Sequence, residues 1–85
     1  MNISVGDLLT VNEQKYMTLE VLKYENSQYA FVNKVTADEE VTDEFYIFED
    51  LGDHVKIIED DNLRKILLPM FEKMLVMDIK KNSEN

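Results

Sequence analysis

The side chains that could carry out catalysis are few and scattered in this sequence. His54 is the only histidine and there is no cysteine, so the usual catalytic triads and transition-metal clusters are out of reach. Gly6 and Gly52 stand alone, which excludes a glycine-rich phosphate-binding loop. We therefore expect no enzymatic activity, no cofactor and no dedicated metal site.

Carboxylates are the one chemically distinctive group present in large numbers. Eighteen Asp and Glu residues against nine Lys and Arg give a formal net charge of −9. Carboxylate pairs serve as acid and base in glycoside hydrolysis, but in so acidic a chain such pairs arise by chance. The spacing of a calcium-binding EF-hand loop is also missing. The acids therefore predict a surface property and not a reaction.

The acidic residues are concentrated in the middle of the chain. Residues 38–61 hold eleven Asp and Glu against one lysine, a net charge of −10, whereas residues 1–37 carry −1 and residues 62–85 carry +2. A surface of this sign repels a nucleic-acid duplex or an anionic membrane. Its natural ligand is a protein partner with a basic surface. The candidate acidic interaction surface consists of Asp38, Glu39, Glu40, Asp43, Glu44, Glu49, Asp50 and Asp53.

Length and composition indicate a single small cytoplasmic domain. At 85 residues one core just suffices, and we place the domain at residues 1–81 with a frayed end at residues 82–85. The absence of cysteine fits a reducing compartment. The first residues lack the features of a signal peptide, and no apolar run is long enough to span a membrane.

Hydrophobic alternation and turn residues predict four to five strands ahead of the last third of the chain. Met17, Leu19 and Val21 alternate with polar residues, the pattern of a strand that buries these apolar side chains on one face. A shift of the apolar side after Val21 indicates a bulge or a strand covered on both faces. Residues 36–43 are acidic without apolar periodicity, which predicts an exposed, mobile loop. The expected strands, joined in an antiparallel meander, span about residues 8–11, 15–24, 28–35, 44–48 and 54–58.

The segment from Asp60 to Met77 is the only one with strong helical periodicity. Asp60 and Asp61 suit the cap and first turn of a helix. The sequence thus predicts an α+β fold in which a helix at about residues 61–78 covers one face of the sheet. Seven apolar side chains fall on the arc expected to contact the sheet, namely Leu63, Ile66, Leu67, Met70, Phe71, Met74 and Met77.

Two features of this helix go beyond a simple cover. Pro69 lies inside the pattern, where proline removes a backbone hydrogen bond, so we expect a kink near it or a second short helix beginning there. Leu68, Leu75 and Ile79 project beside the arc that faces the sheet. They form a candidate apolar interface that a homodimer could bury.

Several short motifs follow one another in a distinctive order. Y-x-N-x-x-Y marks the first hairpin, F-Y-I-F-E a later strand and I-I-E-D-D the entry to the apolar-periodic helix. With this order, the chain from Lys15 to Leu75 resembles the YrzB-like family of uncharacterised small acidic bacterial proteins. The resemblance implies the α+β fold, and the family has no established activity to carry over. The residues that carry it are Tyr24, Tyr29, Ala30, Tyr46 to Phe48, Ile58 to Asp60, Leu63, Leu67 and Phe71.

These observations favour a non-enzymatic protein-protein interaction module of the cytoplasm. One alternative is an inhibitor of the phage or mobile-element type, whose carboxylates mimic nucleic-acid phosphates and bind a basic nuclease or polymerase surface. The other is a self-associating structural protein. A further possibility for the acids is that they only keep a small β-rich domain soluble.

Overall fold

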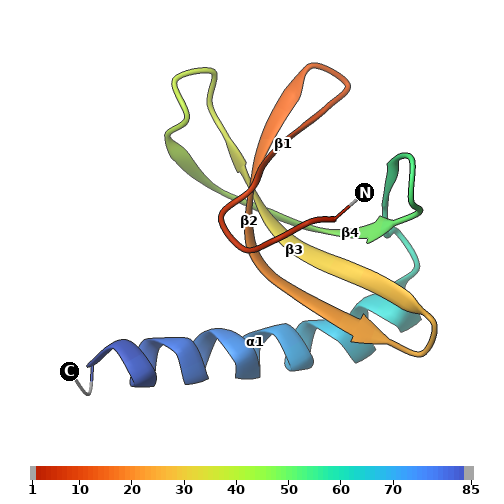
Figure 1. Ribbon diagram of the computed structural model, residues 1–85, viewed down its shortest axis with the longest axis vertical. Coiled ribbons are helices and arrows are strands. Elements are labelled where there is room, and N and C mark those ends of the chain that lie inside the picture. The colour runs from red at the N-terminus through yellow and green to blue at the C-terminus, as the bar shows by residue number, and fades with distance from the viewer. Residues whose placement is uncertain (1, 84–85) are drawn as a thin grey trace.

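The structure, a computed structural model, describes residues 2–83 and has the α+β architecture that the sequence predicts. Five strands form one antiparallel sheet in the order of the chain, curved into a half-barrel, and a single helix follows them (Figure 1). The meander and the covering helix are both confirmed. The elements are β1 (Leu8–Val11), β2 (Gln14–Tyr24), β3 (Ser27–Val35), β4 (Val41–Asp50), β5 (Val55–Ile57) and α1 (Asp61–Ser83).

Tight turns join the first three strands. Asn12 and Glu13 connect β1 to β2 with φ values of 51° and 67°, the left-handed conformation that a two-residue hairpin requires. Glu25, with φ 56°, opens the equally short turn to β3. Gly52, with φ 97°, fills the same need between β4 and β5. These turns fix the register of the sheet.

β2 contains a bulge, but it lies before Glu20 and not after Val21, where the apolar side shifts in the sequence, and the residues buried before it also differ from those expected. The pairing of β2 with β3 shifts between Thr18 and Glu20. Tyr16 and Thr18 are buried, whereas Met17 and Leu19 are only half-buried. The expectation that Met17 and Leu19 mark the buried face was wrong, because Tyr16 points into the main core of the half-barrel.

The expected long acidic loop at residues 36–43 is also corrected. β4 already begins at Val41, so the connection from β3 is a five-residue turn over residues 36–40. Thr36 closes this turn: its N–H donates to the Glu40 carbonyl at 2.9 Å, and its carbonyl and Oγ1 accept from the N–H groups of Glu39 and Glu40. The acids of this segment are therefore held in an ordered turn and strand.

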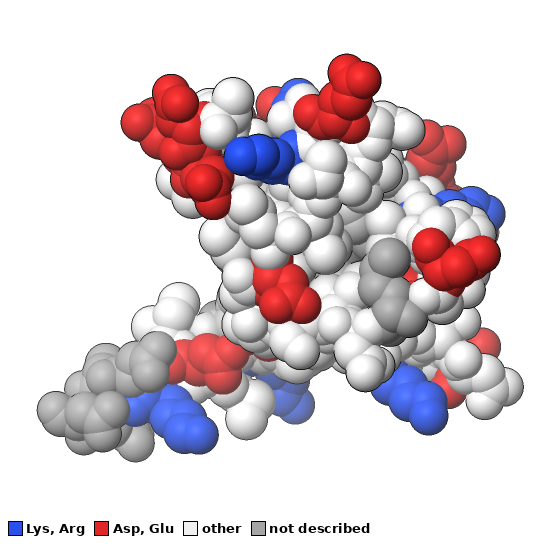
Figure 2. Space-filling view, turned by 45° about the horizontal axis from the view of Figure 1, so that its top comes forward, with Lys and Arg blue, Asp and Glu red and all other residues white. Residues whose placement is uncertain are grey.

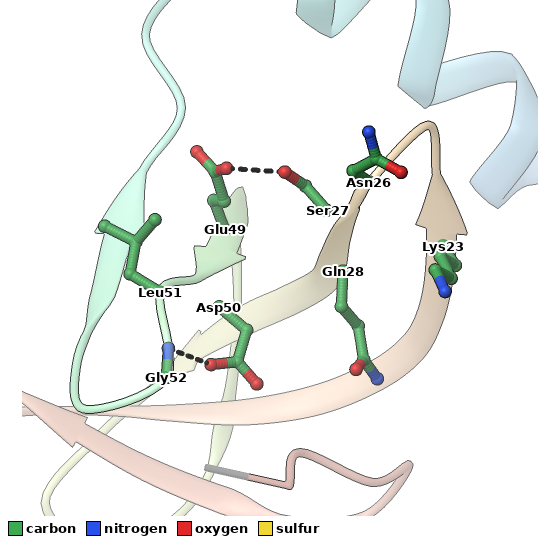
Figure 3. Close-up of a pocket in the computed structure, with 8 residues that line it drawn as sticks. All are labelled: Lys23, Asn26, Ser27, Gln28, Glu49, Asp50, Leu51 and Gly52. Carbon is green, nitrogen blue, oxygen red and sulfur yellow. Dashed lines mark hydrogen bonds between the residues drawn. The ribbon is translucent and has the colours of Figure 1, made fainter.

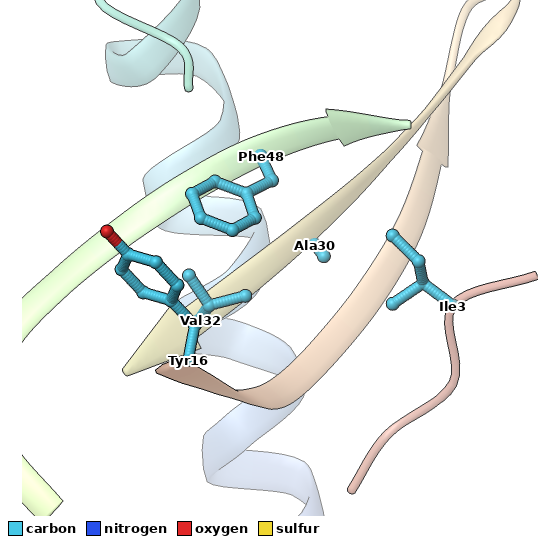
Figure 4. Packing of buried hydrophobic residues seen from close by; sticks show 5 residues of the cluster. All are labelled: Ile3, Tyr16, Ala30, Val32 and Phe48. Atoms are coloured by element: carbon cyan, nitrogen blue, oxygen red, sulfur yellow. The ribbon is translucent and has the colours of Figure 1, made fainter. Parts of the chain in front are cut away.

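A first core cluster fills the concave face of the sheet. It is formed by Ile3, Tyr16, Ala30, Val32 and Phe48, each at most 7% exposed (Figure 4). The Tyr16 and Phe48 rings meet edge to face with centroids 4.9 Å apart. Ile3 comes from the N-terminal segment, which crosses this face ahead of β1 (Figure 1). The strand residues and this segment together bury the side of the sheet opposite the helix.

A second core cluster lies between the sheet and α1. Leu67 and Phe71 of the helix, both 0% exposed, pack with Tyr29, Ile47 and Ile58. Alternate residues of a strand point to opposite faces, which is why β3 and β4 contribute to both clusters. The helix thus holds the convex face, as expected.

The start of α1 matches the sequence prediction. Asp60 Oδ1 accepts hydrogen bonds from the N–H groups of Asn62 and Leu63 at 2.9 and 3.3 Å, so Asp60 is the N-cap. The helix continues through Pro69 as one element (Figure 1), which excludes a second helix beginning at Pro69. It runs to Ser83, past the expected end at residue 78. Glu84 and Asn85, the end of the segment expected to fray, lie outside the described residues.

The buried side of α1 is rotated from the predicted arc. Ile66, Met70 and Met77 were expected on the sheet, but they are 44%, 37% and 59% exposed. Leu68 and Leu75, placed outside the arc, are half-buried, and Leu68 packs on the second cluster. The sheet is too small to cover the whole apolar circumference of the helix, so one side of it remains in solvent.

Candidate interaction surface

The eight acids of the candidate surface do not form a single patch. Five lie in the β3–β4 turn or at the beginning of β4, and three lie at its end or in the β4–β5 turn. Glu49 follows Glu44 by five positions along β4, a distance of roughly 17 Å in an extended strand. Figure 2 shows the acidic side chains on separate prominences of the sheet, and basic side chains along the helix.

The acids at the end of β4 are used in local contacts. Glu49 accepts a hydrogen bond from Ser27 Oγ at 2.9 Å, and Asp50 accepts one from the Gly52 N–H at 2.8 Å. Asp53 pairs with the exposed His54, and this hydrogen bond is the main reason that the pKa of Asp53 is lowered. These contacts give the acids a role in shaping the turn.

These residues border a shallow polar cleft of about 480 Å³ between the β2–β3 and β4–β5 turns (Figure 3). Its walls include Lys23 and Gln28 besides Ser27, Glu49 and Asp50. The two hydrogen bonds drawn in Figure 3 join wall residues to one another. In this cleft the Ser27 hydroxyl and the Glu49 carboxylate are hydrogen-bonded to each other at 2.9 Å, and none of the residues that line it is a histidine.

The acids at the beginning of β4 face solvent. Asp38, Glu39, Glu40 and Asp43 are exposed. Glu44 makes two side-chain contacts: an ion pair with Lys34 at 3.5 Å and a hydrogen bond that it accepts from Tyr46 at 3.3 Å.

A buried asparagine on β3 holds this part of β4 in place. The pairing of β3 with β4 shifts between Asn33 and Val35, where β4 bulges. Asn33, 2% exposed, donates from Nδ2 to the carbonyls of Thr42 and Glu44 at 2.8 and 3.0 Å. Thr42 Oγ1 donates to the Lys34 carbonyl at 2.6 Å. Since a bulge leaves backbone groups without ladder partners, these bonds keep the acidic segment rigid.

Two exposed apolar side chains lie among these acids. Val41 is 75% exposed and Phe45 is 47% exposed. Phe45 stacks on Phe31 with ring centroids 5.6 Å apart, and Phe31 stacks on Phe71 at 5.4 Å. The stack leads from the buried helix contact out to solvent. We name the acidic β4 surface for the group formed by Asp38, Glu39, Glu40, Val41, Asp43 and Phe45.

The candidate apolar interface on α1 is divided by the structure. Leu68 and Leu75 are half-buried, whereas Ile79 is 67% exposed. A different set of helix residues forms a continuous exposed line. Ile66, Met70 and Met77 fall within about 40° of one another at 100° per residue, and we call them the outer stripe.

The last turns of α1 extend past the sheet (Figure 1). All side chains of residues 76–81 are exposed, with Val76 at 50% and Met77 at 59%. Lys73 and Lys81, both exposed, lie on the two sides of the outer stripe. This part of the helix is therefore apolar and basic, the opposite in charge of the acidic β4 surface.

A buried carboxyl group that sequence reasoning missed lies between β2 and α1. Glu20 is 4% exposed and pairs across the strands with Phe31. Burial, a hydrogen bond with Asp78 and repulsion by Asp78 together raise the pKa of Glu20 to about 7. In the sequence Glu20 occupies a polar position of an alternating strand, which predicts an exposed side chain. The bulge in β2 turns this side chain toward the helix.

Within residues 2–83, no group of three or more Asp, Glu and His side chains is arranged to hold a metal ion. None of the helices in the same range is long and apolar enough to cross a membrane. Comparisons with protein-family models, with curated proteins and with solved structures give no match.

Proposed function

We propose that this protein is a non-enzymatic protein-protein interaction module that works in the cytoplasm. Its docking site is the acidic β4 surface, and its partner is a protein with a basic and partly apolar surface. The resemblance to the YrzB-like family is compatible with this proposal, since that family has no established activity.

One observation carries the proposal: exposed apolar side chains stand among carboxylates on a rigid scaffold. Val41 and Phe45 are 75% and 47% exposed, and an exposed apolar group with a charged rim is typical of a protein-binding site. The Asn33 hydrogen bonds fix the backbone around Asp43, so little conformational entropy is lost when a partner binds. Acids that served only solubility would need neither the rigidity nor the apolar centre.

The nucleic-acid mimic stays an alternative with less support. Mimicry calls for carboxylates in rows that imitate regularly spaced phosphates. The structure divides the eight predicted acids between two ends of β4 and engages Glu44, Glu49, Asp50 and Asp53 in local contacts. The side chains of Asp38, Glu39, Glu40 and Asp43 make none of these contacts, and they lie in the same turn and strand end as the exposed Val41 and Phe45. This combination suits a folded protein partner better.

Site-specific photo-crosslinking in the native host tests this function. A photoreactive amino acid at Val41 should yield a discrete adduct with a protein, and the yield should fall several-fold at high salt because the contact is partly electrostatic. The same group at Lys56, exposed on β5, is the matched control. Equal or absent adducts at the two positions would contradict the proposal.

A further inference from the structure

We propose that the basic, apolar partner of the acidic β4 surface is the outer stripe of α1 in a second copy of this chain. The two contacts form together in a two-fold dimer, in which each copy gives its helix to the other and receives one in return. This inference rests on the proposed function and adds the identity of the partner.

The outer stripe is an apolar surface that the sheet of the same copy does not bury. Ile66, Met70 and Met77 keep 44%, 37% and 59% of their surface exposed, although each is large and apolar. They form one line along the helix, while Val76 and Ile79 are exposed on other sides of its last turns. A line of this kind on a long helix is the form in which helices dock into protein surfaces.

The charges around the two surfaces indicate that each binds the other. The outer stripe lies between Lys73 and Lys81, within a segment of net charge +2, whereas the acidic β4 surface belongs to a segment of net charge −10. Both surfaces have an apolar centre and a charged rim, and the rims have opposite signs. Two such surfaces attract each other and exclude partners of the wrong sign.

The two surfaces cannot satisfy each other inside one copy. Phe71 is fixed on Phe31 at a centroid distance of 5.4 Å, and this contact sets the rotation of the helix. The outer stripe lies roughly 120° around the helix from Phe71, so it points away from the ring stack that leads to Phe45. Figure 2 shows a recess between the acidic prominence of the β3–β4 turn and the end of the helix.

Two-fold symmetry makes the arrangement self-limiting. Each copy presents one stripe and one acidic surface, so a pair related by a two-fold axis satisfies both contacts at once. The area is modest beside the roughly 800 Å² per partner of a standard interface, so we expect a dimer that dissociates on dilution. Salt should weaken it by about tenfold or more as ionic strength rises from 50 to 500 mM.

Sedimentation equilibrium of charge-reversed variants tests the pairing. In the stripe variant Lys73→Glu and Lys81→Glu are combined. In the β4 variant all four acids of the acidic β4 surface are replaced by lysine, which changes its charge from −4 to +4; they are Asp38, Glu39, Glu40 and Asp43. Each variant alone should dimerise at least tenfold more weakly than the wild type, because like charges then face each other. An equimolar mixture should recover the wild-type affinity, since both contacts again join opposite charges.

The control variant Lys56→Glu changes the same kind of charge on β5, away from both surfaces, and should dimerise as the wild type does. Circular dichroism melts of all variants show whether each is folded. A monomeric wild type, a β4 variant that dimerises normally, or a mixture that stays monomeric would overturn the pairing. If the pairing fails but a Val41 adduct with another protein forms in the host, the proposed function stands and only the identity of the partner is wrong. If no Val41 adduct forms, the proposed function is wrong as well.

Discussion

Replacing Phe71 by alanine should lower the free energy of unfolding by about 3–5 kcal/mol. Phe71 is fully buried and its ring stacks on Phe31, so truncation removes a large transfer energy and leaves a cavity between helix and sheet. A domain of this size has only about 5–15 kcal/mol of total stability. Urea titration followed by circular dichroism measures the change.

The matched control for this substitution is Ile66→Ala. Ile66 lies on the same helix but is 44% exposed, so its loss should change stability by less than about 1 kcal/mol at dilute concentration. If the two variants lose similar stability, the helix does not pack on the sheet through the side that contains Leu67 and Phe71.

Replacing Glu20 by glutamine should stabilise the protein at alkaline pH and leave it nearly unchanged near pH 4. Burial, then the hydrogen bond with Asp78 and its negative charge, raises the pKa of Glu20 from 4.5 to about 7. The native state therefore keeps a proton that the unfolded chain has released. The wild type loses stability as the pH rises from about 4.5 to 7, and this loss is complete above pH 7.

The size of the effect follows from the same pKa values. A shift from 4.5 to about 7 corresponds to about 3 kcal/mol, so the glutamine variant should be more stable than the wild type by roughly that amount at pH 8. Chemical unfolding at several pH values measures it. Glu59→Gln, at an exposed position, is the control. A difference between Glu20→Gln and the wild type that does not vary with pH would contradict the assignment.

Local patterns predicted the elements because the turns and caps of this chain are local. Asn12 and Gly52 adopt the positive φ values that their residue types favour, and Asp60 caps the helix through its own side chain. The alternation in β2 predicted a strand, and the register confirms the strand, although its bulge lies between Thr18 and Glu20 and not after Val21. These features depend on a few neighbouring residues, so the sequence was sufficient.

Features that depend on how the strands and the helix pack on one another could not be predicted from the sequence. The beginning of β4 was taken for a loop because its residues are acidic and exposed, yet Asn33 on β3 pairs with its carbonyls. The exposed side of α1 depends on the rotation of the helix on a sheet too small to cover it. Glu20 is buried only because the β2 bulge and the path of α1 place it opposite Asp78.

These packing features also determine which surfaces remain for a partner. The bulge fixes the acidic segment around Val41 and Phe45, and the contact of Phe71 fixes the rotation that leaves Met70 and Met77 exposed. The same contacts that stabilise the fold therefore separate an acidic and a basic apolar surface. On the proposed function, two such surfaces bind proteins with selectivity for charge.

Methyl NMR of the purified protein shows directly whether these two surfaces are docking sites. As concentration rises at low salt, the methyl signals of Val41, Met70 and Met77 should shift together, and those of the half-buried Met74 and the buried Val32 should stay in place. Added salt should reverse the shifts. Spectra that do not change with concentration, or shifts at Met74 and Val32 as large as those at Met77, would show that the two surfaces are not docking sites.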